Sequence, residues 1–223
     1  MTSSVEAVIF DLDGVIVRSE GIWAAAREAI AREHGGRWPA GTARRMMGMS
    51  STEWSAFMHD ELGVRLPPAA ISDAVVERLR DGYRKDLPLI PGAAEAVERL
   101  AGEWPLGLAS SANRPVIELV LDLARLARHF SIIVSSEEVA RGKPAPDVYL
   151  EAASRLAVDP AAAIVVEDST SGILAGNAAG MGVVAIPDPE YPPADAALER
   201  AGLVLGSIAE LTVEAVRRAA DPS

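Results

Sequence analysis

The sequence contains no cysteine, so it has neither a disulfide framework nor thiolate chemistry. Aromatic residues make up only 4% of its 223 residues, and no apolar run approaches the length of a membrane span. The first residues lack a basic segment followed by an apolar stretch, and we therefore expect no secretory signal and a cytoplasmic protein. Basic residues are also scarce, which gives a net charge of -11. This charge argues against nucleic acid or an anionic membrane as a partner.

The chain has enough apolar residues, 49%, for a substantial core, and they are arranged in short runs. The first run, Val5–Phe10, has the length and the β-branched content of a buried strand. After Pro88, helical segments alternate with further apolar runs, a pattern that predicts βαβ units. We therefore expect an α/β fold with a doubly wound parallel sheet. The later predicted strands are Leu106–Ala109, Ile132–Val134, Ala163–Val166, Val183–Ile186 and Leu203–Leu205.

Residues 19–85 show helical periodicity and no convincing strand. Pro88 and Pro91 mark the return of the chain to the sheet. We therefore expect a small helical cap domain at 19–85, inserted after the first strand, and an α/β core made of residues 1–18 and 86–223. The helices predicted within the insert are Ser19–His34, Pro39–Met47, Ser51–Leu62 and Pro67–Arg84.

Two carboxylates, Asp11 and Asp13, follow the first predicted strand. Residues two apart on a strand point to the same side. Carboxylates at the end of a buried strand are costly unless something positive lies there, such as a divalent cation. A carboxylate can also attack phosphorus, so Asp11 is a candidate nucleophile and Asp13 a candidate general acid and base. Taken alone, such a pair is more often found in a solvated loop than in a catalytic site.

Hydroxyl groups follow the second predicted strand. Ser110 and Ser111 come directly after Leu106–Ala109 and before a helix. A hydroxyl beside the free N–H groups of a helix N-terminus can hold a phosphate. We favour phosphate binding for Ser110, whereas helix capping explains Ser111 and Asn113 at least as well.

Two further loops carry charged residues. Lys143 lies in a proline-stiffened loop, where a flexible ammonium can neutralise a phosphate. Glu167 and Asp168 follow the strand Ala163–Val166. Asp168 is a candidate ligand of Mg²⁺, and Glu167 is either a second ligand or its support. A plain charge pair at a helix N-terminus is the alternative interpretation. Because the carboxyl ends of parallel strands share one sheet edge, we expect these loops to converge.

Four segments resemble, in order, the motifs of the haloacid dehalogenase superfamily. They are DLDGV at 11–15, LASS at 108–111, GKPAPD at 142–147 and VVEDSTSG at 165–172. The resemblance covers almost the whole chain and extends to the β-phosphoglucomutase-like branch, in which a small cap follows the first motif. It implies a Rossmann-like core, Mg²⁺ as cofactor and an aspartyl-phosphate intermediate.

The resemblance also implies a role for each motif residue. Asp11 would be the nucleophile and Asp13 the acid and base, with the Asp13 carbonyl on the metal. Ser110 and Lys143 would bind the phosphate and take part in catalysis, and Ser111 is a further candidate phosphate ligand. The predicted metal ligands are Asp11, Asp13, Glu167 and Asp168.

We therefore expect a Mg²⁺-dependent phosphatase that acts as a monomer on a small phosphorylated metabolite, such as a sugar phosphate. A sugar phosphomutase is the alternative, but the mutase pattern has a histidine where this chain has Trp23, and an arginine where it has 48–51. A phospho-acceptor signalling module is a remote alternative. In such modules the lysine comes last in the chain, whereas here Lys143 precedes Glu167.

Substrate choice is expected to depend on the cap. Most of its methionines and aromatic residues are better explained as the small core of the cap than as a pocket lining. Arg27 could reach a distal anion on the substrate, although a surface arginine is the commoner case. The segment 188–193 is expected to form a lip near the site or a stiff loop. The cap candidates are Trp23, Arg27, Met46, Met47, Met49, Trp54 and Phe57.

Overall fold

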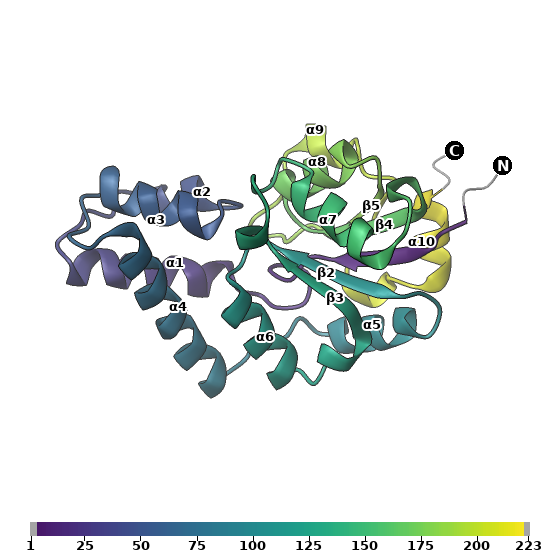
Figure 1. Cartoon of the computed structure of the whole chain (residues 1–223), viewed down its shortest axis with the longest axis horizontal. Coiled ribbons are helices and arrows are strands. Elements are labelled where there is room, and N and C mark those ends of the chain that lie inside the picture. Colours follow the sequence, from purple (N-terminus) through teal and green to yellow (C-terminus); the bar gives the residue numbers. More distant parts are fainter. Residues whose placement is uncertain (1–3, 221–223) are drawn as a thin grey trace.

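A six-stranded parallel sheet lies at the centre of the structure, a computed structural model that describes residues 4–220 (Figure 1). The strands follow the order β3-β2-β1-β4-β5-β6, and every neighbouring pair is parallel. The first strand is therefore central, and the chain builds the sheet outward from it in both directions. The strands are β1 (Ala7–Phe10), β2 (Leu106–Ser110), β3 (Phe130–Ser135), β4 (Ala163–Glu167), β5 (Gly182–Ala185) and β6 (Leu203–Val204).

Helices bury both faces of the sheet, so the strand residues are apolar on both sides. Val8 and Phe10 of β1 belong to a core cluster with residues of α5, α6 and α10, whereas Ile9 belongs to a second cluster with residues of α7, α8 and α9. This arrangement confirms the predicted doubly wound fold. The helices over the sheet are α5 (Ala93–Ala101), α6 (Arg114–Leu123), α7 (Asp147–Leu156), α8 (Thr170–Ala178), α9 (Asp195–Leu198) and α10 (Val213–Ala220).

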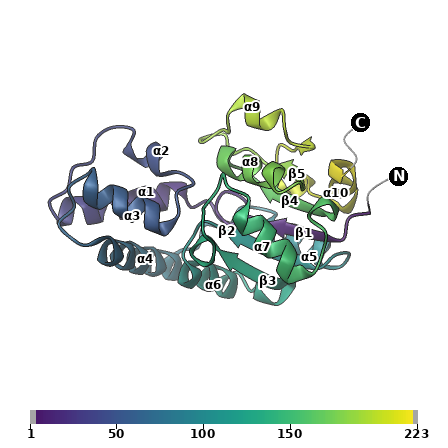
Figure 2. The same ribbon diagram turned by 45° about the horizontal axis from the view of Figure 1, so that its top comes forward.

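A second group of helices lies beside the carboxyl edge of the sheet (Figures 1 and 2). Helix α4 packs against both α1 and α3. The fully buried side chains of Trp54 and Leu79 contribute to the core of this group. Ser50 begins α3 with a capping box, in which its side chain and that of Glu53 accept each other's backbone N–H. The helices are α1 (Glu20–Glu33), α2 (Thr42–Met46), α3 (Ser51–Asp60) and α4 (Pro68–Lys85).

The two connections between the helical group and the sheet run side by side. The Arg18 N–H donates to the carbonyl of Pro88 over 2.9 Å, and the Ile90 N–H donates to the carbonyl of Ile16 over 2.9 Å. Val17 forms bridges with both Asp13 and Leu89. The chain therefore leaves and re-enters the sheet through one narrow, hydrogen-bonded pair of segments.

The element bounds differ from the sequence prediction by up to three residues, at both the starts and the ends of elements. Strand β1 begins at Ala7, two residues later than predicted. Helix α2 begins at Thr42, not at Pro39, because Gly41 adopts a left-handed conformation with φ 84° at its N-cap. Both differences fall at ends, where side-chain periodicity carries the least information.

Candidate active site

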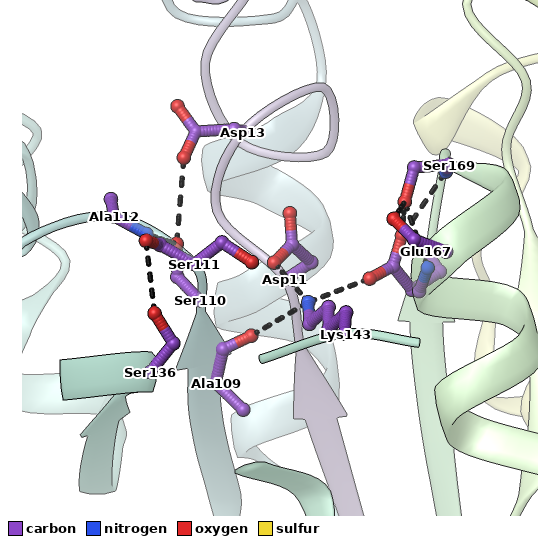
Figure 3. A network of polar contacts seen from close by, with 12 residues as sticks. Asp11, Asp13, Ala109, Ser110, Ser111, Ala112, Ser136, Lys143, Glu167 and Ser169 are labelled. Atoms are coloured by element: carbon purple, nitrogen blue, oxygen red, sulfur yellow. Dashed lines mark hydrogen bonds and ion pairs between the residues drawn. The ribbon is translucent and has the colours of Figure 1, made fainter. Parts of the chain in front are cut away.

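Three neighbouring strand ends bring the predicted site residues together (Figure 3). Asp11 directly follows β1, Ser110 is the last residue of β2, and Glu167 is the last residue of β4. Since β1 lies between β2 and β4, the three side chains start from adjacent positions on one edge. In doubly wound sheets this is the place where the strand order reverses and ligands bind.

Lys143 connects the loop before α7 to two of these strand ends. Its Nζ atom donates hydrogen bonds to Oδ1 of Asp11 over 2.6 Å, to Oε1 of Glu167 over 2.7 Å and to the carbonyl of Ala109 over 3.2 Å. An ammonium group has three protons to donate, so these contacts use all of them. The ammonium also lies 4.7 Å from the ring centroid of Tyr149. Lys143 is therefore held rigidly between two buried carboxylates.

Glu167 is fully buried, and both of its oxygen atoms are saturated with hydrogen bonds. Oε1 accepts from Lys143 and, over 2.7 Å, from the hydroxyl of Tyr149. Oε2 accepts from the backbone N–H groups of Asp168 and Ser169 and from the Ser169 hydroxyl, over 2.9 to 3.1 Å. This carboxylate therefore orients Lys143 and the start of helix α8 at the same time.

The site holds more negative than positive charge, and the pKa values reflect it. Burial, followed by the charges of Glu167 and Asp13, raises the pKa of Asp11 to about 8, although Lys143 partly opposes this. Burial and the neighbouring carboxylates also raise the pKa of Asp168 well above its ordinary value. Burial favours neutral Glu167, but the ion pair and hydrogen bond with Lys143 prevail and lower its pKa. The excess of carboxylates at this site therefore favours the binding of an additional cation.

Asp13 points away from Asp11 and toward the helical group. Its Oδ1 accepts a 3.0 Å hydrogen bond from the indole N–H of Trp23 in α1. Its Oδ2 lies 3.4 Å from the hydroxyl of Ser110, a long and weak contact (Figure 3). The predicted acid and base is thus held between the sheet and the helices that cover it.

The two serines after β2 occupy different environments. The Ser110 hydroxyl is buried and accepts a hydrogen bond from the N–H of Ala112 over 3.0 Å, which tightens the turn. Ser111 is partly exposed, lines the cavity described below, and is held by a hydrogen bond from Ser136 to its carbonyl. The Asn113 side chain does not cap α6: its Nδ2 donates to Ser72 and Glu137, and its Oδ1 accepts no hydrogen bond from residues 4–220.

Oxygen atoms of three acidic residues lie close enough to bind one metal ion. Asp11, Glu167 and Asp168 each offer an atom within 4.8 Å of the others. Gly14 makes room for this cluster, because a Cβ atom there would lie 1.9 Å from Oδ2 of Asp168. Its φ of +80° also favours glycine. Crowded carboxylate oxygens are the donors that Mg²⁺ prefers, so the residues fit this ion.

A cavity of about 580 Å³ opens over these groups, between the sheet edge and the helical group. This volume lies within the range of small-molecule sites. Tyr191, Pro192 and Pro193 line one side, which agrees with the lip predicted at 188–193. Most of the predicted cap residues line the opposite side, whereas Phe57 does not. These are Trp23, Arg27, Met46, Met47, Met49 and Trp54.

Tyr149 was not among the residues predicted for the site, and the burial of Arg27 was not expected. Tyr149 follows the GKPAPD motif, and its position on the buried face of α7 was the available signal. Arg27 is only 6% exposed, so the expectation of a surface arginine is wrong. Its spacing, four residues after Trp23 and three before Ile30, places it on the apolar face of α1. That periodicity could have revealed its burial.

The chain is similar in sequence to known hydrolases. A family model for haloacid dehalogenase-like hydrolases matches residues 8–186. A probable pseudouridine-5'-phosphatase of Drosophila melanogaster is 32% identical over 215 residues, which cover 92% of this chain and 91% of that protein. Hexitol phosphatase B of Escherichia coli (strain K12) is 32% identical over 220 residues, which cover 93% of this chain and 95% of that protein.

The fold is shared with solved structures. A β-phosphoglucomutase from Clostridium difficile superposes with a TM-score of 0.83, covering 97% of both chains at 24% identity. At this identity the likeness concerns the fold. Within residues 4–220, no helix has the length and apolar character needed to cross a membrane.

Proposed function

This chain belongs to the haloacid dehalogenase-like hydrolase family, and we propose that it hydrolyses a small phosphomonoester through an aspartyl-phosphate on Asp11. The chain is a phosphoric monoester hydrolase of the β-phosphoglucomutase-like branch, as its similarity to phosphatases indicates. The names of those relatives favour a sugar phosphate or a similar metabolite as substrate. One observation carries the proposal: Lys143 bridges Asp11 and Glu167 at the floor of a cavity large enough for such a substrate.

Asp11 is suited to attack phosphorus because only one of its oxygens is engaged. Lys143 occupies Oδ1, whereas Oδ2 has no hydrogen bond from any residue between 4 and 220. Attack by Asp11 forms the bond to phosphorus and breaks the ester bond, and Asp13 gives a proton to the leaving oxygen. Water then attacks the acyl phosphate, Asp13 takes its proton, and inorganic phosphate leaves. Asp11 is restored as a carboxylate.

The phosphate is proposed to lie beside Lys143, near the turn that follows β2. Lys143 supplies the positive charge. Ser111 lines the cavity and is partly exposed to it. Ser110 is also a proposed phosphate ligand. Its hydroxyl now contacts Asp13 at 3.4 Å, and this weak contact must give way when Asp13 turns toward the leaving group.

We assign the metal site to Asp11 and Asp168, together with the Asp13 main-chain carbonyl. Mg²⁺ bound there supplies positive charge that screens the repulsion between Asp11 and an incoming phosphate. Glu167 is assigned as the support of Lys143 and not as a direct ligand, because five donors already satisfy its two oxygens.

The division into a core, 1–18 and 86–223, and a cap, 19–85, is part of the proposal. The paired connections and the cavity between the two parts support it. In this arrangement the cap excludes water from the reacting groups and brings Trp23 to Asp13. The protein is proposed to act as a monomer, which light scattering after gel filtration tests.

The test is release of inorganic phosphate from a panel of phosphomonoesters, with and without Mg²⁺. We expect activity that requires Mg²⁺ and is lost in Asp11→Asn, a change that keeps the size of the side chain. Retention of activity in Asp11→Asn would refute Asp11 as the nucleophile. A phosphomutase would instead need a bisphosphate activator and yield an isomer. The absence of the mutase histidine at Trp23 favours the phosphatase.

A further inference from the structure

Arg27 is a buried cation of the cap that has no hydrogen bond or ion pair with any side chain in residues 4–220. It is 6% exposed, and its Nε atom is buried without a hydrogen-bond partner. Its other guanidinium nitrogens also have no hydrogen bond or ion pair with any residue from 4 to 220. A buried charge that lacks a partner is destabilising. A ligand that supplies an anionic partner would remove this cost.

Two indole rings hold the guanidinium in place. Its central carbon lies 4.7 Å from the ring centroid of Trp23 and 4.9 Å from that of Trp54. These rings pack edge to face at 6.1 Å. Cation–π contacts favour the charge, but they do not satisfy its N–H donors. The arginine is therefore fixed in position, and its hydrogen-bonding capacity is left for the cavity that it lines.

Among residues 4–220, Arg27 is the buried, unpaired cation that the cavity offers to the leaving-group side of a substrate. Lys143 also lines the cavity, but Asp11 and Glu167 occupy it. Arg44 lines it from an exposed position. The other charged residues around the cavity are acidic and would repel an anionic substrate tail. They are Asp11, Asp13, Glu20, Glu167 and Asp168.

The position of Arg27 relates it to the proposed proton donor. Trp23 contacts Asp13, and Arg27 lies four residues later, on the same face of α1. Slightly more than one helical turn, about 6 Å, therefore separates the two positions along the helix. Burial lowers the pKa of Arg27 to about 10, and Glu20 and Asp13 oppose this through space, yet neither lies within ion-pair distance. An anion that meets Arg27 would thus belong to the part of the substrate that carries the leaving oxygen.

We propose that Arg27 binds a second anionic group, a carboxylate or a second phosphate, on the leaving-group part of the substrate. A guanidinium matches either group with two parallel hydrogen bonds. The proposal rests on the proposed phosphatase function and narrows its substrate class to phosphomonoesters with an acidic tail.

Three ligands of one chain length test this proposal in the Asp11→Asn background, where turnover is blocked. They are propyl phosphate, the same chain ending in a carboxylate, and the same chain ending in a second phosphate. Calorimetry with Mg²⁺ present gives their dissociation constants. We expect at least one acidic ligand to bind tenfold or more tightly than propyl phosphate. Which of the two does so identifies the anion.

The tenfold preference is expected to fall below twofold when Arg27→Met is added. The matched control is Arg32→Met, because Arg32 lies on the exposed face of the same helix and pairs with Glu28. This control keeps the preference. Equal binding of all three ligands, no measurable binding of either acidic ligand, or a preference that survives Arg27→Met each overturns the proposal.

Thermal unfolding separates binding from a structural role. Arg27→Met removes an unpaired buried charge, and we expect its unfolding temperature to stay the same or rise. A lowered unfolding temperature with unchanged preference marks a structural arginine and contradicts the proposal. If Arg27→Met does not fold, Arg27→Lys retains the charge without the planar fork, and the preference should still fall severalfold. Hydrolysis of propyl phosphate by the wild type tests the phosphatase separately, so either idea can fail alone.

Discussion

The indole N–H of Trp23, in the first cap helix, donates a 3.0 Å hydrogen bond to Oδ1 of Asp13 at the sheet edge. This contact joins the cap to the proposed acid and base. A hydrogen bond to a charged group contributes on the order of 1.5 kcal/mol. The position of the cap is therefore linked directly to the orientation of a reacting group.

Trp23→Phe is expected to lower kcat about threefold to tenfold, because the ring stays while the donor to Asp13 is lost. Steady-state kinetics on the best phosphomonoester of the panel measure this effect. Trp54→Phe is the control, since Trp54 packs on Trp23 but has no contact with Asp13. An equal loss in both variants would mean that aromatic packing, and not the hydrogen bond, is responsible.

Gly14→Ala is expected to weaken Mg²⁺ activation at least tenfold. A Cβ at this position would lie 1.9 Å from Oδ2 of Asp168 and must displace that carboxylate. Backbone strain at φ +80° contributes a further cost of about 1 kcal/mol. Gly180→Ala separates the two effects, because Gly180 has φ +78° and nothing within 4 Å. Titration of activity with Mg²⁺ should change for Gly14→Ala and not for Gly180→Ala.

Two substitutions around the buried carboxylate should differ strongly in stability. Tyr149→Phe removes one of five donors to Glu167 and is expected to lower the free energy of unfolding by about 1 kcal/mol. Glu167→Gln removes the negative charge beside Lys143 and places an amide N–H₂ group against groups that also donate hydrogen bonds. We expect it to lower the free energy of unfolding by about 3–5 kcal/mol. Urea unfolding measures both. Similar costs would contradict the view that Glu167 organises the network.

Mg²⁺ binding should release protons near pH 7. Burial, Glu167 and Asp13 raise the pKa of Asp11 from its ordinary 3.8 to about 8, and the pKa of Asp168 is raised as well. Between pH 3.8 and about pH 8, the folded, metal-free protein therefore binds more protons than the unfolded chain. The contribution of Asp11 to stability consequently decreases as the pH rises through this window. A bound cation favours the ionised carboxylates and expels the protons.

Calorimetry in buffers with different ionisation enthalpies measures this proton release, and the Mg²⁺ affinity should increase with pH. Asp11→Asn should release fewer protons, because one of the two titrating carboxyls is gone. Binding heats that do not depend on the buffer would show that both carboxyls are already ionised in the metal-free protein.

The chain alone predicted the sheet and the residues that meet at its edge. Apolar runs of three to six residues alternate with helical segments, and this local pattern is sufficient to predict a doubly wound fold. Because parallel strands end at a common edge, the residues after them must lie near one another. Asp11 and Lys143, separated by 132 positions, form an ion pair for this reason.

Sequence periodicity alone did not distinguish the environments of adjacent side chains of the same chemical type. Ser110 and Ser111 are neighbours with the same chemistry, yet only Ser111 lines the cavity. Glu167 and Asp168 are adjacent carboxylates, yet donors surround Glu167, and the two pKa values shift in opposite directions. Such differences depend on which donors the fold places within 3 Å.

The order of residues along the chain thus determined the fold, the catalytic candidates and their common edge, since local periodicity and strand direction specify these. Only the tertiary structure decided that Arg27 is buried without a partner and that Trp23 reaches Asp13. The first fact arises from packing among the cap helices and the second from packing of the cap on the core, and such packing depends on many distant residues at once. That packing, and not any motif, sets the environment of the substrate's leaving group.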